Sequence, residues 1–301
     1  MTIIISIIII VLLLVVLILN ALFLYLQKRG SKALGGTAPQ IKRDAGLDER
    51  TEKFLKLKKD VWTIKSKFNG NKLVGWFTDN NADVSVILVH GFAVDHSSLD
   101  IHAQLFHHLG YNVLQIDNQA AGQSGGKYMG YGYIESRDLL DWIDELLRHR
   151  PNDKIILFGA SMGAATVMLT SGESLPDNVK AVIEDSGYTS AEDILSYHCQ
   201  KRYKIKGLWL IKGASIISRI RAGFFYGQAN CQKALAKNQL PVLFMHGKND
   251  FTVPIEMERK LSTCGNFSRM VYDSLGVHIR SYYIDSNKYQ ATVENFLEHY
   301  L

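Results

Sequence analysis

The feature that most constrains the fold is a buried-type strand that runs directly into a serine turn and then a helix. Residues 155–158 are all apolar, and Gly159-Ala160-Ser161-Met162-Gly163 follows them at once. A serine on so sharp a turn leaves almost no room for side chains two residues before and after it, and glycine stands at both places. The sequence therefore predicts a tight turn that presents Ser161, and a helix whose first N–H groups point toward that serine.

Apolar strands alternate with helical patterns along most of the chain. We expect helices near 98–109, 134–149, 161–171, 255–263 and 287–299, and strands near 61–67, 72–78, 84–90, 111–116, 154–158, 179–184, 241–246 and 267–272. This alternation predicts an α/β fold with a mostly parallel eight-stranded sheet covered by helices on both faces. About 300 residues are enough for a single core of this type, which we place at 61–301. Residues 187–240 break the rhythm with apolar helical patterns, and we expect them to form a helical insertion.

Two strands near the C-terminus end in loops that carry a carboxylate or a histidine. Asp250 follows the seventh strand, and His278 follows the eighth. Together with Ser161 they fall just beyond the C-terminal ends of strands, where sites collect in open α/β sheets. Serine, histidine and a carboxylate in this combination support nucleophilic attack on an acyl carbon. Asp185, at the end of the sixth strand, is the alternative acid.

His278 stands out among ten histidines because it alone lies between the last strand and the final helix. We expect it to be the general base. His246 precedes a glycine at a strand end and is expected to shape the loop that carries Asp250. His102 lies in the helix near 98–109 and is expected to be solvated.

From about residue 61 to its C-terminus, the chain resembles serine hydrolases of the α/β-hydrolase superfamily, and within them the bacterial serine aminopeptidase-like branch. The resemblance covers about four-fifths of the chain. It rests on the Gly159–Gly163 turn, a G-x-x-D-x-x-V-P pattern at 247–254, a closing helix at 289–296, and two short motifs, His90-Gly91-Phe92 and Gly276-Val277-His278.

The resemblance implies the chain order nucleophile Ser161, acid Asp250 and base His278, and it favours Asp250 over Asp185. It also implies an oxyanion hole made of the backbone N–H groups of Phe92 and Met162, with the His90 side chain shaping the loop. The insertion at 187–240 then corresponds to a cap over the serine.

The implied activity is hydrolysis of a small-molecule or short-peptide acyl substrate, with no cofactor and no metal. A carboxylic ester is the first expectation, because a triad and an oxyanion hole suffice for reactive esters. A peptidase or amidase and an acyltransferase are alternatives on the same triad. A non-catalytic binding protein with this fold is the alternative of a different class.

One loop departs from the family pattern. Such enzymes usually read D-x-R-G-x-G-x-S after the fourth strand, whereas residues 117–124 place Gln119 at the arginine and Ala120 at its glycine neighbour. We expect the fold to survive this change, and the loop interactions of that arginine to be altered.

The N-terminus predicts a membrane segment. Residues 3–26 are apolar except for Ser6 and Asn20, and a helix of about 24 residues can cross a hydrocarbon core of about 30 Å. No Lys or Arg precedes this run, and it exceeds the roughly 7–15 apolar residues of a signal peptide. We therefore expect residues 1–27 to form an uncleaved single-span anchor in the cell membrane. A signal peptide cleaved near Ala33-Leu34-Gly35 is the alternative.

Residues 28–60 are expected to connect the anchor to the hydrolase core. Lys28, Arg29 and Lys32 follow the span, which by the positive-inside rule puts the body in the cytoplasm, although anchored relatives are often expected outside the cell. The basic amphipathic stretch at 53–59 is interpreted either as a solvated helix packed on the body or as a contact with anionic lipid.

Other classes of site lack their sequence signatures. The net charge of +5 is modest, and no aromatic-interleaved basic module predicts nucleic-acid binding. The three cysteines, Cys199, Cys231 and Cys264, form no C-x-x-C pair and no zinc pattern. The residues around Gly126-Lys127 lack the spacing of a phosphate-binding P-loop.

Overall fold

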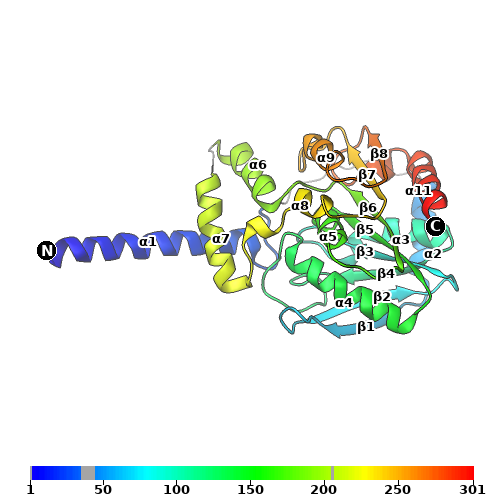
Figure 1. The fold of residues 1–301 in the computed structure, drawn as a ribbon, viewed down its shortest axis with the longest axis horizontal. Helices are drawn as coiled ribbons and strands as arrows, with labels where there is room; N and C mark the ends of the chain where they lie inside the picture. The colour runs from blue at the N-terminus through cyan, green and yellow to red at the C-terminus, as the bar shows by residue number, and fades with distance from the viewer. Residues whose placement is uncertain (1, 35–44, 205–206) are drawn as a thin grey trace.

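The core of the protein is an eight-stranded sheet (Figure 1) in a computed structural model that describes residues 2–34, 45–204 and 207–301. The strand order is β1-β2-β4-β3-β5-β6-β7-β8, and β2 runs antiparallel to both of its neighbours while the other neighbouring pairs are parallel. The strands are Asp60–Lys65 (β1), Lys72–Thr78 (β2), Val84–Val89 (β3), Asn112–Asp117 (β4), Lys154–Ala160 (β5), Val179–Asp185 (β6), Val242–Gly247 (β7) and Arg269–Ser274 (β8). The prediction of a mostly parallel eight-stranded α/β sheet is confirmed.

Helices cover both faces of this sheet. The helices of the described residues are α1 (Thr2–Gln27), α2 (Ala45–Leu55), α3 (Asp100–His108), α4 (Tyr133–His149), α5 (Met162–Ser171), α6 (Ala191–Tyr203), α7 (Leu208–Ala222), α8 (Cys231–Leu235), α9 (Ile255–Leu261), α10 (Ser281–Ile284), α11 (Ser286–Tyr300) and two 3-10 turns, His96–Leu99 and Tyr226–Gln228.

Strand β5 shows why helices pack on both faces of the sheet. Its side chains alternate: Ile155 and Leu157 join the core formed with α4 and α5, and Ile156 and Phe158 join the core formed with α3 and α11. All four are apolar and buried, so the strand reads as a continuous hydrophobic run.

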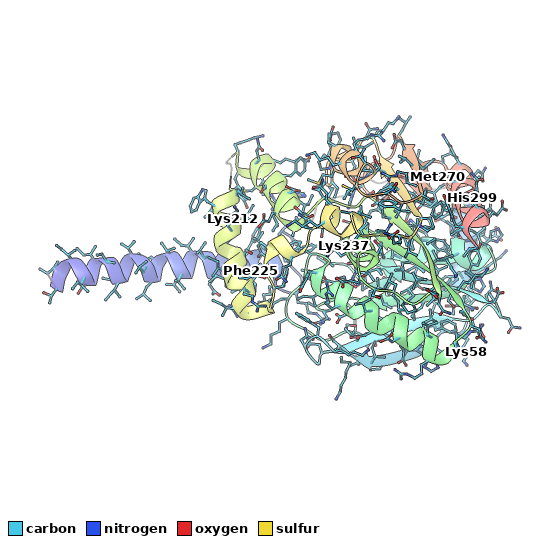
Figure 2. All side chains as sticks on the ribbon, viewed as in Figure 1. Lys58, Lys212, Phe225, Lys237, Met270 and His299 are labelled. Atoms are coloured by element: carbon cyan, nitrogen blue, oxygen red, sulfur yellow. The ribbon has the colours of Figure 1, made fainter. Side chains whose placement is uncertain are left out.

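The insertion between β6 and β7 holds α6, α7 and α8. Helix α8 packs back against α5, whereas α6 and α7 lie at the end of the body from which α1 projects (Figure 1). Lys212 and Phe225 lie at this end, and Lys58, Met270 and His299 lie toward the opposite end (Figure 2).

Helix α1 does not project freely along its whole length, because its last turns are packed in the core. Residues 2–18 are exposed, whereas Phe23, Leu26 and Gln27 are buried. The Tyr131 hydroxyl donates a hydrogen bond to the Leu26 carbonyl at 2.6 Å, and the Gln27 amide donates to the Met129 carbonyl at 2.6 Å. The boundary that we placed between residues 27 and 28 therefore falls inside packed structure.

Helix α2 accounts for part of the basic stretch at 53–59. It packs against α3, and the ring of Phe54 is buried with its centroid 5.6 Å from that of His107. It lies at the end of the body opposite the projecting part of α1 (Figure 1), so the structure agrees with a helix packed on the body. Residues 35–44 of the predicted connecting segment lie outside the described residues.

Candidate active site

Ser161 sits on the turn that the sequence predicts, between the last residue of β5 and the first residue of α5. Its φ of 56° is in the left-handed region, which is strained for a residue with a side chain. The flanking glycines make this turn possible. A Cβ at Gly163 would lie 1.9 Å from the Val89 carbonyl oxygen, and one at Gly159 would lie 2.1 Å from the Gly163 carbonyl oxygen.

Three side chains from separate segments meet at this turn. Ser161 Oγ lies 2.9 Å from His278 Nε2, and His278 Nδ1 lies 2.6 Å from Asp250 Oδ2. Ser161 follows β5, Asp250 lies in the loop after β7, and His278 lies in the loop after β8. Because these strands are parallel neighbours in the order β5-β6-β7-β8, their C-terminal ends bring the three residues to one edge of the sheet.

The Asp250 carboxylate is fixed on both oxygens. Oδ1 accepts hydrogen bonds from the backbone N–H groups of Thr252 at 2.8 Å and Val253 at 2.9 Å, while Oδ2 faces His278. Burial alone would raise the pKa of Asp250, but its hydrogen bonds and electrostatic interactions with His246 and His278 outweigh burial and hold this pKa well below its usual range. Asp250 is therefore ionised wherever the enzyme could operate.

His246 lies beneath the same carboxylate. Its Nε2 is 2.9 Å from the Val253 carbonyl oxygen and 3.4 Å from Asp250 Oδ2. Burial would lower the pKa of His246, but Asp250 and the charge of Glu184 raise it to about 9. His246 therefore holds the acid loop, as expected from its place before Gly247, and it also places a positive charge beside Asp250.

Asp185, the alternative acid, is engaged elsewhere. Its carboxylate accepts hydrogen bonds from the Tyr289 hydroxyl at 2.9 Å and the Ser186 hydroxyl at 2.7 Å. Within the described part of the chain, the carboxylate that contacts the His278 ring is that of Asp250. Burial raises the pKa of Asp185.

The two expected oxyanion donors lie beside Ser161. Met162 is the first residue of α5, so its N–H has no carbonyl four residues earlier within the helix. On the other side, a Cβ built on Gly91, the neighbour of Phe92, would lie 3.3 Å from the Ser161 Cβ. The Phe92 ring stacks on Tyr131 with centroids 5.5 Å apart, which fixes the position of this loop.

His90 has a structural environment. Its ring is buried, Nδ1 lies 2.8 Å from the Gly91 carbonyl oxygen, and Nε2 accepts a hydrogen bond from the Asn118 N–H at 3.0 Å. Burial lowers the pKa of His90, so the neutral ring can accept this bond.

The loop that departs from the family pattern is stabilised differently. Gln119 donates to Asp138 at 2.6 Å and accepts from the amides of Asn69 and Asn71, and Ala120 has a φ of 59°, the conformation that glycine adopts most easily. An arginine still contacts this loop, but it is Arg29, which donates to the Ser124 carbonyl at 2.8 Å. No local sequence pattern predicts that contact, because 95 residues separate Arg29 from Ser124.

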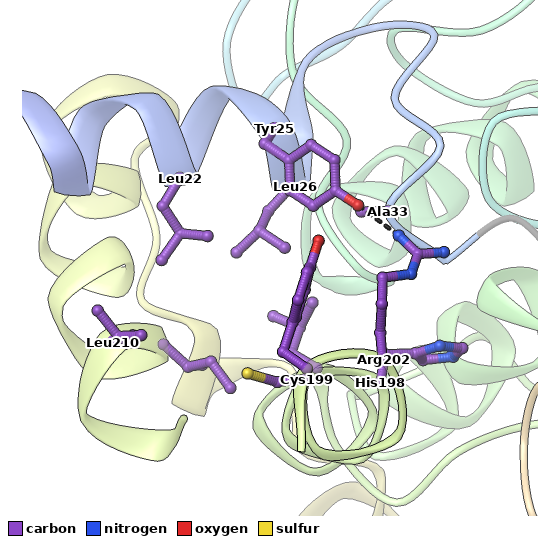
Figure 3. Close-up of a pocket in the computed structure, with 11 residues that line it drawn as sticks. Leu22, Tyr25, Leu26, Ala33, His198, Cys199, Arg202 and Leu210 are labelled. Carbon is purple, nitrogen blue, oxygen red and sulfur yellow. Dashed lines mark hydrogen bonds between the residues drawn. The ribbon is translucent and has the colours of Figure 1, made fainter. Parts of the chain in front are cut away.

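A cavity of about 180 Å³ lies between α1, α6 and α7 (Figure 3). Leu22, Leu26 and Leu210 are among its apolar walls, and the His198 ring lies at its edge. His198 Nε2 is 3.0 Å from the carbonyl oxygen of Thr252, whose N–H contacts Asp250. The cavity is thus separated from the acid loop by the His198 ring.

Among the described residues, no group of three or more His, Cys, Asp or Glu side chains is arranged to hold a metal ion.

Comparisons with known proteins agree with the fold and with a serine hydrolase. Residues 80–187 match the model of a family described as serine aminopeptidase, S33. YqkD of Bacillus subtilis is 28% identical over 82% of this chain and 82% of its own length, and YfhR of Escherichia coli is 26% identical over 74% and 76%.

Solved structures show the same architecture. The esterase Pf2001 of Pyrococcus furiosus has a TM-score of 0.65 at 21% identity, and the match covers 88% of this chain and 99% of that one. Est1E of Butyrivibrio proteoclasticus, solved with ferulic acid bound, has a TM-score of 0.57 at 19% identity and covers 79% and 98%.

Proposed function

We propose that this serine hydrolase with an α/β-hydrolase fold cleaves a carboxylic ester through an acyl-enzyme formed on Ser161. The observation that carries this proposal is the His278 ring, which bridges Ser161 Oγ at 2.9 Å and Asp250 Oδ2 at 2.6 Å. These are the contacts that a nucleophile, a base and an orienting acid require.

The proposed reaction begins when His278 Nε2 takes the Ser161 proton as Oγ attacks the ester carbonyl carbon. The ionised Asp250 holds the proton on Nδ1 and stabilises the imidazolium that forms. The Phe92 and Met162 N–H groups bind the oxyanion, and one such donor is typically worth about 2.7–4 kcal/mol. His278 then protonates the departing alkoxide, and a water molecule, activated by the same ring, releases the acid.

One observation favours an ester: the similar structures include esterases. The family description favours a peptidase as the second candidate.

The test uses the full chain in detergent. We expect it to hydrolyse short p-nitrophenyl esters and to be labelled by a fluorophosphonate, and Ser161→Ala should lose both properties. Ser262→Ala, at the end of α9, is the matched control and should keep both. Labelling or ester hydrolysis that survives in Ser161→Ala would overturn the proposal. Faster turnover of amino-acyl p-nitroanilides than of esters would favour the peptidase.

We also propose that α1 anchors the protein in the cell membrane. Among the described helices, Thr2–Gln27 is long and apolar enough to cross a bilayer, a property that a signal sequence shares. An uncleaved anchor is supported by packing: cleavage near Ala33-Leu34-Gly35 would remove the buried Phe23 and Leu26 from the core. Full-length protein should therefore resist alkaline extraction from membranes. A soluble form that begins near Gly36 would contradict the anchor.

The basic residues Lys28, Arg29 and Lys32 support a cytoplasmic body. Protease added to cells stripped of their wall should then leave the body intact. Digestion of the body under these conditions would reverse the orientation without affecting the anchor.

A further inference from the structure

Helix α7 carries an apolar face that the protein does not cover. Trp209, Ile216 and Ile220 are 71%, 56% and 75% exposed, and they lie on one side of the helix at the spacing of its turns. We call these three residues the outer face of α7. The opposite side of the helix is buried against the body. Large apolar side chains gathered on one exposed face usually mark a contact surface.

The segment that carries this face is basic. Residues 194–240 contain nine of the chain's 34 Lys and Arg residues and none of its 29 Asp and Glu residues, so the rest of the chain is net negative. On α7 itself, Lys212 and Arg219 are exposed beside the outer face. Trp and Ile on one face, with Lys and Arg flanking them, are typical of helices that lie in a membrane interface.

The path of α1 places the outer face next to a bilayer. Figure 1 shows α7 lying across α1 at the point where the free part of α1 leaves the body. The two helices touch at Gly213, where even a Cβ would come within 2.6 Å of the Leu19 side chain. If α1 crosses the membrane, α7 therefore lies along its surface.

The length of the free part of α1 determines how deep α7 lies in the bilayer. The 17 residues Thr2 to Ile18 are exposed, and at 1.5 Å per residue they span about 25 Å. A hydrocarbon core is about 30 Å thick. The free part of α1 falls short by about 5 Å, and placing the helix that crosses it at Leu19 in the edge of the bilayer would make up this difference. Interfacial helices bury their apolar faces to a depth of about 5–10 Å.

We propose that α7 is an interfacial helix whose outer face inserts into the surface of an anionic phospholipid bilayer, beside the point where α1 enters it. This inference rests on the proposed anchor, and it adds a second contact between the protein and the lipid. It places the cap, and the cavity between α1, α6 and α7, at the level of the lipid headgroups. Substrates dissolved in the bilayer would reach the cap without crossing water.

The test places the full chain in phosphatidylglycerol-containing nanodiscs and uses Trp209 as a reporter. It is one of four tryptophans, and subtracting the emission of Trp209→Phe isolates its signal. A lipid brominated near the headgroup end of its acyl chains should quench about half or more of that signal, as expected for an interfacial depth of about 5–10 Å. Aqueous iodide should quench little of it.

Two further variants control for position. In the Trp209→Phe background, Ile220→Trp should restore quenching by the brominated lipid, whereas Val61→Trp on β1, 58% exposed, should not. Lys212→Gln and Arg219→Gln together should weaken the quenching at low salt, and the difference from wild type should shrink as salt screens the basic residues. Lys58→Gln at the opposite end of the body should not change the quenching (Figure 2).

Three results would contradict the insertion of the outer face of α7 in the bilayer. Quenching of Trp209 by iodide but not by lipid would overturn the proposal. Shielding from both would also overturn it, and would indicate a second copy or another protein on this face. Release of the chain from the discs by alkali would show that the anchor fails and the inference with it. Fluorophosphonate labelling of the same samples reports separately on the esterase.

Discussion

Replacing Asp250 with asparagine should nearly abolish catalysis while leaving the site intact. Oδ1 accepts hydrogen bonds from two backbone N–H groups, at 2.8 and 2.9 Å. The amide oxygen of the variant must take that position, because an amide NH₂ cannot accept those bonds. The NH₂ group then faces His278 Nδ1 in place of Oδ2.

This exchange forces the wrong tautomer on His278. Nδ1 has to accept a hydrogen bond from the new NH₂ group, so the proton of the neutral ring moves to Nε2. That nitrogen lies 2.9 Å from Ser161 Oγ in the wild type, and once protonated it can no longer take the serine proton. The equivalent change in a known triad lowers kcat by about 10⁴, which corresponds to about 5.5 kcal/mol of transition-state stabilisation.

The assay is kcat and KM for a p-nitrophenyl ester with full-length protein in detergent, alongside circular dichroism to confirm folding. Asp185→Asn is the matched control, because its carboxylate contacts Tyr289 and Ser186 and not His278; it should keep substantial activity. A folded Asp250→Asn enzyme that retains more than about a tenth of wild-type kcat would refute the tautomer argument. An inactive, folded Asp185→Asn beside an active Asp250→Asn would exchange the two roles.

Three further predictions concern stability. Gly163→Ala should destabilise the fold in urea unfolding by at least about 1–3 kcal/mol, because its methyl group would lie 1.9 Å from a backbone oxygen, whereas Gly227→Ala, whose nearest contact is 3.4 Å, should not; equal values would contradict the packing of this turn. The pKa of His246 is raised to about 9, so its stabilising contribution is complete below the unfolded value of about 6.5 and is lost as pH rises to about 9. The unfolding free energy should therefore fall over that window by up to about 3 kcal/mol more in the wild type than in His246→Gln, and parallel pH profiles would exclude this role. Deleting residues 2–17 should leave the melting temperature of the body unchanged, whereas deleting 2–27 should lower it by removing the buried Phe23 and Leu26, each worth about 2–5 kcal/mol; equal melting temperatures would show that α1 is dispensable to the core.

The strands and the serine turn could be predicted because their signals are local. A buried parallel strand is a short apolar run, and the glycines at 159 and 163 stand at the places where a Cβ would strike the backbone. The positions of Asp250 and His278 could be predicted from where the strands end. The distances between their side chains depend on how β5, β6, β7 and β8 pair in the sheet.

The hydrophobic periodicity of a helix does not predict that a second helix packs against a side facing away from the sheet. His102 was expected to be solvated, and this was wrong: its ring is buried against Phe158, with centroids 5.1 Å apart, and burial lowers its pKa to about 3. Helix α3 carries the sheet on one side and α2 on another, so a residue that looks peripheral in one helix is enclosed by elements far along the chain.

The proposed anchor, α1, is connected to the catalytic site more directly than a tether and a linker would be. The carbonyl of Leu26 accepts the Tyr131 hydroxyl at 2.6 Å, and the Tyr131 ring stacks on Phe92, whose N–H faces the proposed oxyanion site. Two contacts therefore separate the last turn of α1 from the reacting atoms. Because the same turns of α1 touch α7 and line the cavity beside the acid loop, the cap has little freedom to move relative to the anchor. With α1 in the membrane as proposed, this arrangement would hold the site at a fixed height above the bilayer, which would suit a substrate that arrives along the membrane.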